Sequence, residues 1–188
     1  MGREGFEQIM GVHAAPLLVG LRPASLLSFR KDRFEDFEAL LDTYRPCFSC
    51  KGIDMFRVAE GDAYVLLLFY RTEILEKLLA DESAQAVLRR YGYPCGDGLM
   101  ACLHHLQLRM RLQKSFPHEI GLFLGYPVAD VVGFITHKGQ DFCYSGYWKV
   151  YANEEETRAL FDRYAHCTEE FCSRLEAGCS FPELVKAV

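Results

Sequence analysis

The spacing of apolar and polar residues predicts α-helices and β-strands that alternate along the chain. Near the N-terminus, a helical pattern covers residues 3–12, and Pro16 is expected to end this helix. The apolar run at residues 26–29 follows an Arg-Pro turn and predicts a first strand.

A second helix and a pair of strands are expected next. Asp32 and Glu35 have the spacing of a capping box ahead of an apolar stripe at helical spacing, and Pro46 is expected to end that helix. Residues 53–58 and 63–70 predict two strands joined by a loop that contains glycine. The second strand is apolar without alternation, which is typical of a central strand covered on both faces.

The rest of the chain predicts more helix than strand. Helical patterns cover residues 72–91, 97–114, 117–124 and 127–137. A strand or hairpin at 142–151 precedes a long helix, which a capping box at Asn153 opens and Gly178 closes. We therefore expect a single α+β domain over residues 1–188. It should have a small, mainly antiparallel sheet, a helical insertion at about 95–137 and a long C-terminal helix, in an order that fits a ferredoxin-like split β-α-β core.

Composition and charge add limits to this picture. Half of the 188 residues are hydrophobic and a quarter are charged, as in ordinary globular proteins. A net charge of −5 argues against general nucleic-acid binding and against attraction to anionic membranes. The longest apolar run is too short to cross a bilayer, and the first residues do not have the apolar core of a signal peptide. We therefore expect a soluble, cytoplasmic protein whose eight cysteines are thiols or metal ligands.

Two longer stretches carry a resemblance to a known family. The first is FPHEIGLFLGYP at residues 116–127, followed by Asp130 and Gly133, and the second is GYWKVY at residues 146–151. They resemble the hallmarks of a bacterial family that occurs mainly in clostridia and related anaerobes and is catalogued as a domain of unknown function. The resemblance covers nearly the whole chain. It implies a cytoplasmic single-domain protein with no established activity.

His118 and Glu119, within the first stretch, are candidates for chemistry. A histidine beside a carboxylate at the start of a helix can form an acid–base pair or part of a metal site. Position 122 is leucine, so the paired-histidine pattern of zinc proteases is absent. The structural alternative is an ordinary helix start, with Pro117 in the first turn and the carboxylate complementing the helix dipole.

The second stretch predicts a strand with a polar aromatic face. Tyr147, Lys149 and Tyr151 are expected on one face and Trp148 on the other. A lysine between two tyrosines suits a phosphate or a carboxylate, with the rings stacking on a planar ligand. Equally, the segment suits an edge strand whose lysine lies over aromatic rings and discourages aggregation.

Cys47 and Cys50 have the CxxC spacing of metal and dithiol sites. They follow the predicted end of a helix, where the helix dipole opposes thiolate formation. A zinc ion would need further ligands, and the chain has no second CxxC pair. The candidates for those ligands are Cys95, Cys102, His104 and His105.

The sequence thus predicts a small binding or accessory protein of unknown function, with no cofactor, ligand or partner identified. It would hold a small anionic or planar ligand, or a protein partner, in a recess between the helices around His118 and the strand around Trp148. The candidate ligand-binding residues are His118, Glu119, Tyr126, Tyr147, Trp148, Lys149 and Tyr151. The alternative is an enzyme, or a redox or iron-handling protein, that uses His118, Glu119 and Lys149 or the Cys47–Cys50 pair. The absence of a glycine-rich phosphate loop and of a nucleophile elbow disfavours the common hydrolase, kinase and dehydrogenase classes.

Overall fold

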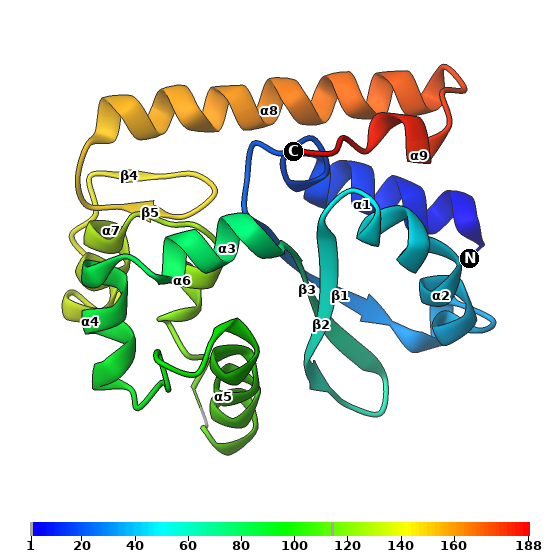
Figure 1. Ribbon diagram of the computed structural model, residues 1–188. Helices are drawn as coiled ribbons and strands as arrows, with labels where there is room; N and C mark the ends of the chain where they lie inside the picture. Colours follow the sequence, from blue (N-terminus) through cyan, green and yellow to red (C-terminus); the bar gives the residue numbers. More distant parts are fainter. Residues whose placement is uncertain (1, 114) are drawn as a thin grey trace. The chain divides into compact units, whose positions relative to one another are not determined.

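The protein is described from a computed structural model that places residues 2–113 and 115–188. The chain divides into two compact units, one made of the residues up to Thr72 together with Tyr164–Val188, and the other of Glu73–Arg163 (Figure 1). The expectation of one domain over residues 1–188 stays a prediction. Helices, short antiparallel sheets and a long helix near the C-terminus confirm the α+β class. Across the described residues, no helix is both long and apolar enough to cross a membrane.

The first unit is built on a three-stranded antiparallel sheet in the order β1-β3-β2 (Figure 1). Its elements are α1 (Arg3–Leu18), β1 (Ala24–Arg30), the 3-10 helix η1 (Lys31–Arg33), α2 (Phe37–Ser49), β2 (Ile53–Glu60), β3 (Tyr64–Arg71), part of α8 (Glu154–Glu176) and α9 (Phe181–Leu184). The apolar strand β3 is central, as its sequence predicts. Since β1 and β2 flank it and are connected through α2, the sheet has the split β-α-β arrangement. The fourth strand that a ferredoxin-like core requires is not in this sheet, because the described strands β4 and β5 pair with each other.

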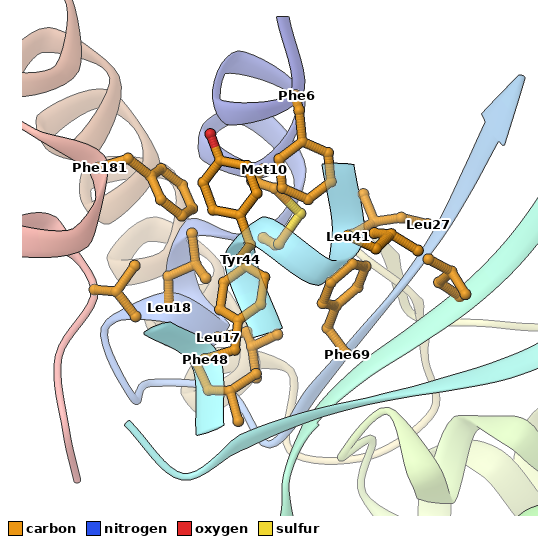
Figure 2. Close-up of a cluster of buried hydrophobic side chains, with 14 of the residues drawn as sticks. Phe6, Met10, Leu17, Leu18, Leu27, Leu41, Tyr44, Phe48, Phe69 and Phe181 are labelled. Atoms are coloured by element: carbon orange, nitrogen blue, oxygen red, sulfur yellow. The ribbon is translucent and has the colours of Figure 1, made fainter. Parts of the chain in front are cut away.

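Aromatic rings fill the core of the first unit, between the sheet and helices α1, α2 and α9 (Figure 2). Phe6, Phe29, Phe48, Phe69 and Phe181 are each less than 2% exposed. Each such ring stabilises the fold by about 1.5–3 kcal/mol relative to an exposed position. The unit therefore has a complete hydrophobic core of its own.

Arg71, at the end of β3, ties three backbone segments of the first unit to this strand. Its buried guanidinium donates hydrogen bonds to the carbonyls of Leu17 and Leu18 at 2.9 Å, Lys51 at 2.9 Å and Lys186 at 2.8 Å. Burial lowers the pKa of Arg71. The fork of five N–H donors suits this role, because it satisfies several carbonyls that do not bond within a helix or strand.

Two proline-based predictions for the first unit are wrong. Pro16 lies inside α1 and Pro46 lies inside α2. A proline deprives the carbonyl four residues earlier of its helical partner, and the residues concerned, Val12 and Asp42, are both exposed. Water can bond these carbonyls instead, so each helix continues past its proline.

The start of α2 also differs from the predicted capping box. The helix begins at Phe37, and Asp36 caps it by accepting a hydrogen bond from the Ala39 amide at 2.9 Å. Asp32 instead pairs with Arg30, at 2.6 Å. The aspartate next to the first buried ring of the helix therefore provides the cap.

The second unit is mostly helical, as the predicted insertion implies. Its elements are α3 (Thr72–Leu79), α4 (Glu82–Arg90), α5 (Leu99–Leu112), α6 (Ile120–Phe123), α7 (Val128–Thr136), β4 (Tyr144–Ser145), β5 (Lys149–Val150) and the first part of α8. The helix expected at 72–91 is broken, because Asp81 caps α4 with hydrogen bonds to two amides of its first turn. The helix predicted at 97–114 ends at Leu112, and residue 114 lies outside the described residues. The segment 142–151 forms a hairpin, one of the two forms predicted for it. The expected alternation of Tyr147, Lys149 and Tyr151 along one strand is wrong, because residues 146–148 form the turn between β4 and β5.

Candidate functional site

A buried carboxylate, Asp130 in the first turn of α7, anchors the β4–β5 hairpin. Its Oδ2 accepts a hydrogen bond from the indole nitrogen of Trp148 at 2.8 Å. Its Oδ1 accepts from the amides of Tyr151 at 2.7 Å and Ala152 at 3.1 Å. Three N–H donors compensate a carboxylate that is only 2% exposed. Asp130 thereby fixes both the tryptophan ring and the end of the hairpin against α7.

Glycines of the two hallmark stretches allow rings to approach the backbone closely. A Cβ at Gly146 would lie 2.4 Å from the Phe161 ring, and one at Gly133 would lie 2.4 Å from Tyr151. At Gly121 a Cβ would lie 2.9 Å from Tyr126. Real Cβ atoms do not come this close to other atoms, so each position requires glycine for packing around the hairpin.

Trp148 and its neighbours form a wall of aromatic rings. The Trp148 ring stacks on Tyr126 with centroids 4.5 Å apart and meets Phe161 edge-on at 4.5 Å. Tyr147 also contacts Phe161, at 5.3 Å. Offset stacking and edge-to-face contacts are the favoured geometries of aromatic pairs, so the wall is held in place from several sides.

The hairpin, α6, α7 and the segment before α6 enclose a cavity of about 360 Å³, which we call the hairpin cleft. Its aromatic lining comes from Phe116, Tyr126, Phe134, Tyr147 and Trp148, and its charged or titratable lining from His118, Asp130 and Lys149. The structure therefore brings five of the seven predicted ligand-binding residues to one recess. They are His118, Tyr126, Tyr147, Trp148 and Lys149.

Lys149 and His118 lie on opposite elements of the cleft but share a neighbour. The Lys149 ammonium donates a hydrogen bond to the Gly139 carbonyl at 2.5 Å and lies 4.6 Å from the Phe142 ring centroid. The Phe134 ring is 5.9 Å from this ammonium and 4.8 Å from the His118 ring. The Lys149 ammonium and the His118 imidazole thus both lie near the Phe134 ring.

Glu119 and Tyr151, the other two candidates, do not line the cleft. Glu119 is 1% exposed and bonds to the guanidinium of Arg109 and, at 3.0 Å, to the hydroxyl of Tyr93. Burial and the Glu119 charge raise the pKa of Tyr93. Tyr151 stacks on His137, with ring centroids 5.7 Å apart. The helix expected from residue 117 also differs, because α6 begins only at Ile120, one residue after Glu119.

Cys47 and Cys50 lie at the end of α2. Cys47 is half-buried in its last turn, and the Cys50 thiol, at the C-cap, donates to the Cys47 carbonyl at 3.1 Å. Burial raises the pKa of Cys47, which disfavours its reactive thiolate form. Within residues 2–113 and 115–188, no three side chains of the types His, Cys, Asp and Glu gather where they could hold a metal ion.

Sequence reasoning did not assign roles to two residues that define the cleft, Asp130 and Phe134. Both are in the first hallmark region, and Asp130 is the only acidic residue in the otherwise apolar helix α7. A lone carboxylate on an apolar helix needs buried partners, and that signal could have identified it as an anchor.

Comparison with known proteins bears on the whole chain. A family model described as "Protein of unknown function (DUF3793)" matches residues 10–185. No curated protein and no solved structure matches. The family match includes all residues of the hairpin cleft and nearly all of both units, and it confirms the resemblance noted in the sequence. The chain belongs to the DUF3793 family.

Proposed function

We propose that the second unit is a binding module that holds a small, planar anion in the hairpin cleft. The observation that carries the proposal is the ammonium of Lys149. It is half-buried among aromatic rings, and within the described part of the chain no carboxylate lies within ion-pair distance of it. An ammonium removed from water without a counter-ion attracts an anionic ligand.

The shape and lining of the cleft support a flat, largely apolar ligand. A volume of about 360 Å³ lies at the lower end of the range of about 300–1,000 Å³ that is usual for small-molecule sites. Phe116 and Tyr147, two of the lining rings, are 47% and 42% exposed. A planar ligand against them would remove apolar surface from water, which favours binding.

A catalytic role has less support than binding. Glu119, the carboxylate that would pair with His118 in catalysis, is held by Arg109 and Tyr93 and does not line the cleft. The raised pKa of Cys47 likewise gives no support to thiol chemistry. We further propose a cytoplasmic location, for which the sequence argument from eight cysteines without a signal peptide is the support.

Fluorescence tests this proposal directly, because Trp148 is the only tryptophan of the chain and lines the cleft. Anilinonaphthalene sulfonate, a monoanion with a flat naphthalene ring, is titrated into the protein while energy transfer from Trp148 is recorded. We expect saturable transfer, and we expect Lys149→Met to weaken binding by about tenfold or more, because a hydrogen bond to a charged group is lost.

Lys77→Met is the matched control, since it removes the same charge from an exposed position of the same unit outside the cleft. Circular dichroism of each variant shows whether it is folded. The proposal is wrong if transfer does not saturate, or if the two folded variants weaken binding equally.

A further inference from the structure

The charges around the hairpin cleft are few and nearly balanced. Among the described residues that line it, Lys149 is the only permanent cation and Asp130 the only carboxylate. Asp130 is bonded by three N–H groups, so its charge is already compensated. Lys149 is therefore the one cationic group that the described lining of the cleft offers to a ligand.

A phosphate group would be poorly accommodated there. It brings a charge of about −1.5 to −2 and three acceptor oxygens, and it is usually held by arginine forks or by the free amides of a helix N-terminus. Among the described residues that line the cleft there is no arginine, and Pro127, the cap residue of α7 beside it, adds no N–H of its own. The single ammonium of Lys149 balances only part of the charge of a phosphate.

A single carboxylate matches the groups that are present. Lys149 has three N–H donors, and one of them bonds the Gly139 carbonyl, which leaves two for a ligand. The His118 imidazole, which contacts the same Phe134 ring, can supply another donor. A carboxylate has two oxygens and one charge, so the ammonium alone balances it.

From these observations we infer that the ligand is an aromatic monocarboxylate, with one or two fused rings against the aromatic wall and its carboxylate between Lys149 and His118. The cleft discriminates against the phosphate ester of the same ring system. This inference rests on the proposed function and names the ligand class of the same site.

The test compares naphthoate, naphthamide and naphthyl phosphate, each substituted at the same ring position, by isothermal titration calorimetry near pH 8. The three ligands share one ring and differ in the charged group. We expect naphthoate to bind about tenfold or more tightly than each of the other two. Lys149→Met should reduce the affinity for naphthoate to that for naphthamide and leave the affinity for naphthamide unchanged. Lys149→Arg should keep the preference for the carboxylate.

The outcomes separate this inference from the proposed function. If naphthyl phosphate binds as tightly as naphthoate or more tightly, and Lys149→Met weakens both, the inference fails and the proposed anion site stands. If naphthamide matches naphthoate in the parent protein, both the inference and the anionic part of the proposed function fail. If none of the three binds and anilinonaphthalene sulfonate does not bind either, the proposed function itself is wrong.

Discussion

Replacing Asp130 with alanine should loosen the β4–β5 hairpin from α7. The change removes the acceptor of three hydrogen bonds, from the Trp148 indole and from the amides of Tyr151 and Ala152. The indole is almost fully buried, so its unsatisfied N–H costs about 1–3 kcal/mol. The two amides belong to half-buried residues that water can reach, so each adds less. We therefore expect a loss of about 2–4 kcal/mol in the free energy of unfolding of the second unit.

Urea unfolding followed by Trp148 fluorescence measures this loss, because the only tryptophan reports on the unit that contains the hairpin. Asp130→Asn keeps one acceptor oxygen and should lose roughly half as much as the alanine variant. Asp162→Asn, at an exposed position of α8 in the same unit, is the control and should change the free energy by less than about 0.5 kcal/mol. A loss below about 0.5 kcal/mol for Asp130→Ala would refute the anchoring role.

Three further predictions concern the rest of the molecule. Arg71→Met removes four hydrogen bonds and should destabilise the first unit by on the order of 3 kcal/mol. Urea unfolding followed by circular dichroism measures this loss, and an unchanged unfolding midpoint would contradict the stabilising role of Arg71. Gly146→Ala should displace the hairpin and weaken dye binding severalfold, while Gly96→Ala, where a Cβ meets nothing within 4 Å, should not; equal effects would contradict the packing account. Burial raises the pKa of Cys102 to about 11, so at pH 8 about one thousandth of it is thiolate. Iodoacetamide followed by mass spectrometry should show Cys102 reacting far more slowly than exposed Cys50, and faster as the pH rises; comparable rates at pH 8 would contradict its burial.

Most elements of the fold could be predicted because their apolar spacing is regular. The strands near residues 53–70 and the long helix ending before Gly178 follow from alternation, from helical spacing and from glycine punctuation. The helix limits at Pro16 and Pro46 could not be predicted, because whether a proline ends a helix depends on whether water can reach the carbonyl that loses its partner. That exposure is a property of the folded structure.

The candidate site could be predicted in part. Aromatic and basic residue types in the two hallmark stretches identified His118, Trp148 and Lys149, which the structure brings to one cleft. The position of Glu119 could not be predicted, because its partner Arg109 lies on a different helix, ten residues earlier. Likewise, Arg71 bonds the carbonyls of Leu17 and Leu18, which lie more than fifty residues earlier in the chain. The spacing of residues along the sequence contains no signal for such a contact.

The central claim is that the hairpin cleft binds a planar anion through Lys149, and the single indole N–H resonance of Trp148 tests it most directly. The ¹⁵N-labelled protein is titrated with naphthoate, and this resonance is followed in two-dimensional NMR spectra. The account predicts a saturable shift of the Trp148 signal, which in folded Lys149→Met requires about tenfold more ligand. An indole signal that stays in place while naphthoate shifts resonances elsewhere would contradict it.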